Sequence, residues 1–194
     1  MPKLLLASGS PRRRQFLTDL GFTFDVVPSH ADESVHDGES PEAYVRRIAH
    51  AKSLPATALD QGTVVLACDT VVTRDEAILG KPLGAEDFAR MMALLSGANH
   101  RVLSSVVVRV VGGESFATTV TTDVTFRTLS DAEIAWYWAT GEPRDKAGGY
   151  ALQGLGAAFI ERIEGSHTSV IGLPLVETLA LLARAGITPP WAGR

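Results

Sequence analysis

Short apolar segments alternate with amphipathic helical segments along this chain. Segments with the character of buried strands are 4–7, 22–27, 63–67, 102–111, 115–126 and 157–163, with a hairpin expected at 71–79. Helices are expected to begin after Ser10 and Ser40 and to cover 84–95, 131–138 and 173–184. Because several expected strands follow one another directly, the sheet cannot be purely parallel. The sequence therefore predicts an α/β fold with a mixed, twisted central sheet flanked by helices.

Length and charge restrict the class of protein. The 194 residues predict one domain, placed at residues 1–187, with a tail at 188–194. A formal net charge of −4 argues against a general nucleic-acid or membrane-surface protein. The single cysteine excludes an internal disulfide, and the apolar runs are too short for a membrane span or a signal peptide. We expect a cytoplasmic protein with no membrane and no stable nucleic-acid partner.

Residues 8–14, Ser-Gly-Ser-Pro-Arg-Arg-Arg, lie between an expected strand and the start of an expected helix. Free backbone N–H groups and the positive end of the helix dipole favour an anion at such a position. Arginines in the first turn add forked donors that suit phosphate oxygens. A capped helix with a solvated basic face explains the same residues equally well. Ser8, Arg12 and Arg13 are therefore candidate anion-binding residues.

Asp69 and Thr70 follow the apolar run 63–67, so they are predicted to lie just past the C-terminal end of a central strand. Open α/β sheets bind their ligands at that end. A carboxylate there could hold a divalent cation or accept a proton from water. The alternative is an aspartate that caps a turn.

Four further polar residues are candidate site residues only when they are considered together. Lys52 and Lys81 are two of only four lysines, and Glu33 lies in an acidic loop. Gln153 lies in the glycine-rich segment 145–154, where the backbone could approach a ligand closely. Each also has an ordinary explanation, because lone lysines and loop carboxylates are usually solvated and loop glycines often serve turn geometry.

Taken together, these residues make the sequence similar to the Maf family of nucleoside triphosphate pyrophosphatases. The resemblance runs from Leu4 to about Leu182. The matching pieces are Ala7-Ser8-Gly9-Ser10-Pro11-Arg12-Arg13, Asp32-Glu33, Ala49 with Lys52, Asp69-Thr70-Val71-Val72, Gly80-Lys81-Pro82, Leu95-Ser96-Gly97 with His100, Thr122-Asp123-Val124-Thr125-Phe126, Thr140-Gly141-Glu142-Pro143, Asp145-Lys146-Ala147-Gly148, Tyr150 with Gln153-Gly154, and Ile171-Gly172-Leu173-Pro174.

The resemblance implies hydrolysis of the α–β phosphate bond of a nucleoside triphosphate, which yields a monophosphate and pyrophosphate. Arg12, Thr70 and Gln153 look like the subgroup that acts on dTTP and UTP. The resemblance also implies Mg²⁺ or Mn²⁺ as cofactor, a homodimer, and a cleft between two lobes of the fold. The implied role is sanitation of the nucleotide pool, with a possible part in cell division arrest.

The resemblance also implies roles for individual residues. Asp69 would accept the proton of the attacking water, and Glu33 would assist in metal binding or in placing that water. The residues that would hold the substrate are Ser8, Arg12, Arg13, Lys52, Thr70, Lys81 and Gln153.

Two other functions stay open at this point. A pyrophosphatase of the inosine triphosphate type would share the architecture but favour purines. A non-catalytic regulator of septum formation would bind nucleotide or nucleic acid without turnover.

Overall fold

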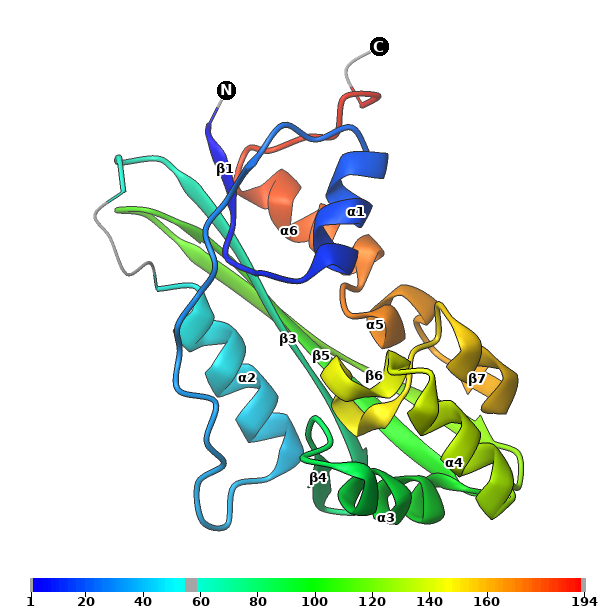
Figure 1. Ribbon diagram of the computed structural model, residues 1–194. Coiled ribbons are helices and arrows are strands. Elements are labelled where there is room, and N and C mark those ends of the chain that lie inside the picture. Colours follow the sequence, from blue (N-terminus) through cyan, green and yellow to red (C-terminus); the bar gives the residue numbers. More distant parts are fainter. Residues whose placement is uncertain (1, 55–58, 193–194) are drawn as a thin grey trace. The chain divides into compact units, whose positions relative to one another are not determined.

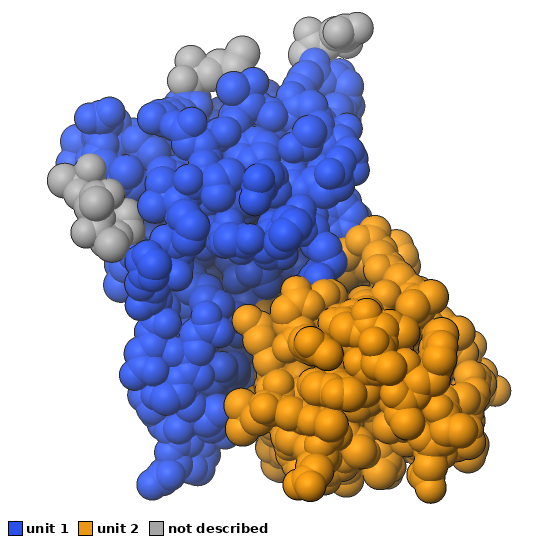
Figure 2. Space-filling view, in the orientation of Figure 1, with its two compact units in different colours: residues 1–69, 104–120, 172–194 blue, residues 70–103, 121–171 orange. Residues whose placement is uncertain are grey.

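The computed structural model describes residues 2–54 and 59–192 (Figure 1). They belong to two compact units, which Figure 2 colours separately. Unit 1 comprises residues 1–69, 104–120 and 172–194, and unit 2 comprises residues 70–103 and 121–171. No helix among the described residues combines the length and the apolar character needed to cross a membrane.

Within the described residues one sheet of seven strands is formed, and it is mixed, as predicted. Its order is β2 (Asp25–Val26), β1 (Leu4–Leu6), β3 (Val64–Arg74), β5 (Asn99–Val110), β6 (Ser115–Phe126) and β7 (Ile160–Glu164), with β4 (Ala77–Leu79) paired to β3 (Figure 1). Strand β1 is parallel to both β2 and β3, whereas the β3–β4 and β6–β7 pairs are antiparallel.

Helices surround these strands in both units. Unit 1 contains α1 (Pro11–Asp19), α2 (Pro41–Lys52) and α6 (Leu175–Arg184), and unit 2 contains α3 (Ala85–Leu95), α4 (Asp131–Ala139) and the short α5 (His167–Ile171). Unit 2 also holds three 3₁₀ helices, η1 (Glu142–Asp145), η2 (Ala147–Gly149) and η3 (Leu155–Phe159). The predicted α/β architecture, a mixed sheet flanked by helices, is confirmed.

The alternation of side chains along β1 and β3 divides the core of unit 1 into two faces. Leu4, Leu6, Val64 and Leu66 pack in one cluster with side chains of α1 and α6, including Leu17 and Leu182. Leu5, Ala7, Val65 and Ala67 form a separate cluster on the opposite face. Asp69 lies two and four residues after Ala67 and Val65, so alternation along β3 places its side chain on the same face as theirs.

Aromatic side chains form a group of ring contacts within the core of unit 2. The ring of Tyr137 meets that of Phe159 edge to face, with 5.0 Å between their centroids. His100 is buried against Phe126 and Tyr150, and its Nε2 lies 2.8 Å from the Tyr150 hydroxyl. Burial lowers the pKa of His100 to about 4, so its ring is neutral at pH 7 and serves packing and hydrogen bonding.

The structure corrects several sequence predictions. Strand β3 does not end before Asp69 but continues to Arg74, because the β-branched residues Val71, Val72 and Thr73 extend it and β4 pairs with its end. The strand expected at 22–27 is reduced to Asp25–Val26, and the strand expected from residue 157 begins only at Ile160, after η3. Helix α5 was not expected.

The helix starts expected after Ser10 and Ser40 are confirmed, although their caps differ, whereas the helix expected from residue 173 begins at Leu175. The side chain of Ser40 accepts a hydrogen bond from the Ala43 amide, whereas Ser10 precedes α1 without a side-chain cap. The tail at 188–194 stays a prediction, and its residues 193 and 194 lie outside the described part of the chain.

Candidate active site

The centre of the candidate site is Asp69, a buried carboxylate in β3. The parallel partner β1 ends opposite Leu66, three residues before Asp69, so the strand runs on past its neighbour here. Lys52 is the last residue of α2, and its side chain reaches Asp69, with 2.8 Å between Lys52 Nζ and Asp69 Oδ1. The side chains of Lys52 and Asp69 are only 12% and 8% exposed, so this ion pair is largely withdrawn from water.

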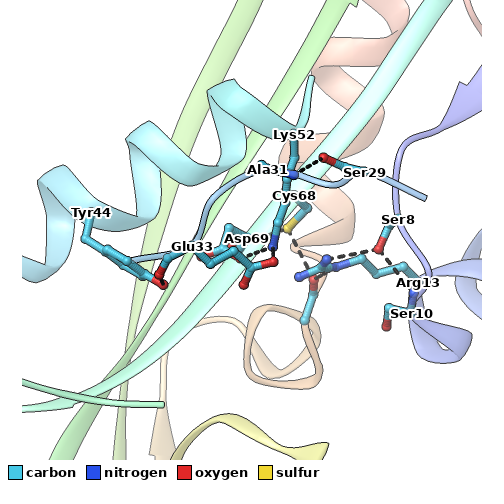
Figure 3. A network of polar contacts seen from close by, with 11 residues as sticks. Ser8, Ser10, Arg13, Ser29, Ala31, Glu33, Tyr44, Lys52, Cys68 and Asp69 are labelled. Atoms are coloured by element: carbon cyan, nitrogen blue, oxygen red, sulfur yellow. Dashed lines mark hydrogen bonds and ion pairs between the residues drawn. The ribbon is translucent and has the colours of Figure 1, made fainter. Parts of the chain in front are cut away.

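Glu33 completes a group of three charges, in which two carboxylates contact one ammonium. Its Oε1 also lies 2.8 Å from Lys52 Nζ, while its side chain is 52% exposed. Lys52 therefore bridges one buried and one solvent-facing carboxylate (Figure 3). In the partly desolvated site these charges interact more strongly than they would in water.

The loop that carries Glu33 has no helix or strand of its own, and side chains of α2 hold it in place. The hydroxyl of Tyr44 donates to the Glu33 carbonyl at 3.0 Å. Arg47 donates to the Ser34 carbonyl and forms a forked pair with Glu39, at 2.6 and 2.7 Å. That pair lowers the pKa of Glu39 to about 2, and burial raises the pKa of Tyr44 to about 12. Both groups therefore keep these hydrogen bonds near neutral pH.

Ser8 and Arg13 form a second polar group in unit 1. Arg13 Nη1 donates to Ser8 Oγ at 3.1 Å, and the Ser10 amide donates to the same oxygen at 3.2 Å. Arg13 Nε donates to the carbonyl of Gly172 at 2.8 Å, and the thiol of Cys68 donates to that carbonyl at 3.2 Å. The Gly172 carbonyl thus ties the Ser8–Arg13 group to the residue that precedes Asp69 (Figure 3).

A small pocket of about 150 Å³ lies beside Lys52 in unit 1. Its walls are mostly apolar, with Ser29, His30 and Lys52 as polar members; the others are Leu5, Ala7, Val27, Pro28, Ala31, Ala51 and Leu54. This volume is smaller than a typical pocket for a whole ligand, so it could hold only a small group or part of a larger ligand.

Five of the predicted site residues meet in these two groups: Ser8 with Arg13, and Glu33 with Lys52 and Asp69. Arg12 lies in the first turn of α1 in the same unit. Thr70, Lys81 and Gln153 belong to unit 2, and the side chains of Lys81 and Gln153 are exposed.

Three members of these polar groups were not anticipated from the sequence as contact residues. Tyr44 and Cys68 had the pattern of ordinary core residues, and only the fold shows their polar contacts. The third is the backbone carbonyl of Gly172, and a backbone acceptor leaves no signal in side-chain identity.

Comparison with known proteins places the chain in a family. A family model described as Maf-like protein matches residues 3–185. The chain belongs to the Maf family. Among the relatives of this Maf protein, a dTTP/UTP pyrophosphatase of Anaeromyxobacter dehalogenans is 51% identical, with 98% of this chain and 97% of the relative covered. Proteins of the same name from Vibrio cholerae (48% identical, 93% and 96% covered) and Myxococcus xanthus (46% identical, 97% and 95% covered) are also similar.

Two solved structures resemble this Maf protein more distantly, each at 14% sequence identity. A nucleoside-triphosphatase / dITP/XTP pyrophosphatase from Mycobacterium abscessus has a TM-score of 0.45, with 95% of this chain and 94% of that chain covered. The Ham1 protein of Staphylococcus aureus has a TM-score of 0.46, with 81% and 79% covered.

Proposed function

We propose that this Maf protein hydrolyses dTTP and UTP to the nucleoside monophosphate and pyrophosphate. Membership of the family and the names of its relatives support a nucleoside triphosphate pyrophosphatase. The observation that carries the proposal further is the buried Asp69, held beside Lys52 and Glu33 with the Ser8–Arg13 group in the same unit. The biological role we propose is sanitation of the nucleotide pool, by a cytoplasmic homodimer.

In the proposed reaction, water attacks the triphosphate and the α–β anhydride bond breaks. Asp69 takes the proton of the attacking water, and pyrophosphate leaves with the bonding electrons. Glu33 helps to place that water. A triphosphate carries a charge of about −4, and charge grows on the leaving pyrophosphate in the transition state. We assign the binding of this charge to Ser8, Arg12, Arg13, Lys52 and Lys81.

The carboxylates of the site fit a hard divalent cation. Mg²⁺ is commonly bound by one or two carboxylates together with substrate phosphates and water. Asp69 and Glu33 already share one cation, the Lys52 ammonium, so their oxygens converge on one region. No group of three potential metal ligands is found among the described residues, which is compatible with a metal that arrives with the triphosphate. A bound Mg²⁺ or Mn²⁺ would neutralise part of the negative charge on the phosphates.

Removal of divalent metal is expected to abolish turnover. The activity should fall to background in excess chelator and return on addition of Mg²⁺ or Mn²⁺, because phosphate charge would otherwise oppose attack by water. Pyrophosphate release measured with and without chelator checks this. Full activity in excess chelator would remove the metal from the proposal.

Replacing Arg13 with alanine is expected to lower kcat/KM by about tenfold to a hundredfold, because a charge-assisted hydrogen bond contributes about 1.5–3 kcal/mol. The loss should be similar for every nucleoside triphosphate, since phosphates carry no base information. Arg14, exposed on the same helix, gives the matched control, and Arg14→Ala should change kcat/KM little. A change in base preference caused by Arg13→Ala would place Arg13 in the base pocket instead.

We assign recognition of the base to Gln153. Uracil and thymine present an N3–H donor beside a carbonyl acceptor, and a glutamine amide can match both at once. Guanine presents two adjacent donors, N1–H and N2–H, which a carboxylate accepts better than an amide does. Cytosine could pair with a flipped amide, so its rejection needs a neighbour that fixes the amide, and Thr70 and Arg12 are our candidates.

Gln153→Glu is expected to weaken the use of dTTP and UTP and to improve the use of GTP, shifting the preference by about tenfold or more. The physical reason is that a polar group that the bound base covers and leaves without a hydrogen-bond partner costs about 1–3 kcal/mol. Values of kcat/KM for dTTP, UTP, CTP and GTP on both proteins measure the shift. If the ranking of the four nucleotides does not change, Gln153 does not recognise the base.

The experiment that tests the proposed reaction is product analysis. Incubation with dTTP should release dTMP and pyrophosphate in equal amounts. Formation of dTDP and orthophosphate would show cleavage of the other anhydride bond and contradict the proposal.

A further inference from the structure

Glu142 makes a cluster of hydrogen bonds around the segment that carries Gln153. Its Oε2 accepts from the Leu155 amide at 2.9 Å, and its Oε1 accepts from the Gly156 amide at 3.0 Å. The hydroxyl of Tyr137 donates to Oε1 at 2.7 Å and accepts from the Ala151 amide at 3.2 Å. One carboxylate and one hydroxyl thus hold the backbone on both sides of Gln153.

Two glycines allow this close approach. A Cβ placed on Gly154 would lie 2.4 Å from Glu142 Oε2, and one on Gly156 would lie 2.6 Å from the Tyr137 hydroxyl. The segment therefore packs against the carboxylate and the hydroxyl with no room for a side chain at either position. Gln153 itself is exposed, so packing does not fix its side chain, and its position depends on how its backbone is held.

Tyr137 and Glu142 are themselves held in place within unit 2. Tyr137 is fully buried, and its ring meets Phe159 edge to face. Burial by itself would raise the pKa of Glu142, but the hydrogen bonds from Tyr137, Leu155 and Gly156 outweigh it, and the pKa lies below its ordinary value. The carboxylate is therefore ionised at neutral pH and acts only as an acceptor, which suits three converging donors.

We infer that Glu142, together with Tyr137, is a positioning residue for base selection, which acts by fixing the backbone on both sides of Gln153. This inference rests on the proposed function, in which Gln153 recognises the base. A glutamine amide discriminates between uracil and cytosine only while its orientation is fixed. The held backbone sets where the Gln153 amide lies, and the neighbour proposed above fixes which end of the amide faces the base. Freeing the segment moves the amide away from that neighbour, so that it can turn and accept either base.

A double-mutant cycle tests the inference, with the ratio of kcat/KM for UTP to that for CTP as its readout. Gln153→Ala should lower the ratio about tenfold or more, and Glu142→Ala should lower it by a similar factor. The double variant should lower it no further than Gln153→Ala alone, because both changes remove the same discrimination. If the double variant lowers the ratio by the product of the two single factors, Glu142 acts independently of Gln153, and the inference is overturned.

Glu133 provides the matched control. It is also a glutamate of unit 2 that accepts a hydrogen bond from a backbone amide, that of Ser130 at 2.8 Å, but these contacts, with Ser130 and Arg127, lie outside 151–156. Glu133→Ala should lower thermal stability and leave the UTP-to-CTP ratio unchanged. If Glu133→Ala shifts the ratio as much as Glu142→Ala does, general destabilisation explains the effect and the inference is wrong.

Tyr137→Phe covers the case in which Glu142→Ala does not fold. It removes only the hydroxyl, and it should lower the ratio in the same direction and speed hydrogen exchange at the amides of Ala151, Leu155 and Gly156. Faster exchange with an unchanged ratio overturns the inference but leaves base recognition by Gln153 intact. An unchanged ratio in Gln153→Ala would instead refute base recognition by Gln153, and the inference would fail with it.

Discussion

Asp69→Asn is expected to lower kcat for dTTP and UTP by about a hundredfold or more, while the fold and nucleotide binding are retained. Loss of a general base typically costs a factor of this size. Asparagine has almost the same shape and can still contact Lys52, so the change removes the proton acceptor with little disturbance to packing. Single-turnover rates and nucleotide binding measured on the same preparation separate the chemical step from binding.

Asp25→Asn is the matched control for this change. Asp25 also pairs with a lysine, Lys3, at 2.7 Å, but both side chains are more than half exposed. This variant should retain wild-type kcat. Near-normal turnover in Asp69→Asn would exclude Asp69 as the proton acceptor.

Lys52→Met is expected to lower the free energy of unfolding by about 3–5 kcal/mol, because it leaves the buried Asp69 carboxylate without its cation. It should also abolish most turnover, since Lys52 is proposed to bind phosphate. Denaturant unfolding without nucleotide measures the stability. Adding Asp69→Asn to Lys52→Met should restore part of the lost stability, because the unpaired buried charge is then removed.

Lys3→Met tests whether this loss is specific to the site. The Lys3–Asp25 pair has a shorter N–O distance than the Lys52–Asp69 pair but lies on the surface, where water screens the attraction. We expect no measurable change in stability for Lys3→Met. Equal effects of the two lysine changes would show that burial of the Lys52 pair adds nothing.

Local sequence signals predicted the elements well where the deciding contacts are local. Ser40 before Pro41 marks the start of α2, and Ser130 with Glu133 forms the capping box that begins α4. The end of β3 could not be predicted in the same way. Residues 71–73 favour a strand in any context, and whether they continue the strand of Asp69 depends on pairing with β4.

The candidate site was predicted as a set of residues but not as an arrangement. Lys52 and Asp69 are separated by 17 positions, and only the tertiary fold brings Lys52 Nζ to 2.8 Å from Asp69 Oδ1. Glu33 lies in a loop whose position depends on Tyr44 and Arg47, so no local pattern could place it beside Lys52. The sequence therefore identified candidates through resemblance, and long-range packing decided which of them meet.

The most direct test of the proposed function is a panel of nucleoside triphosphates assayed with the wild-type protein and pyrophosphate detection. It should include dTTP, UTP, CTP, GTP and ITP in the presence of Mg²⁺ or Mn²⁺. We predict that kcat/KM for dTTP and UTP exceeds that for each of the other three by about tenfold or more. A preference for ITP would identify the inosine triphosphate type of pyrophosphatase, and absence of turnover with every nucleotide would indicate a non-catalytic protein; either result would contradict the proposed function.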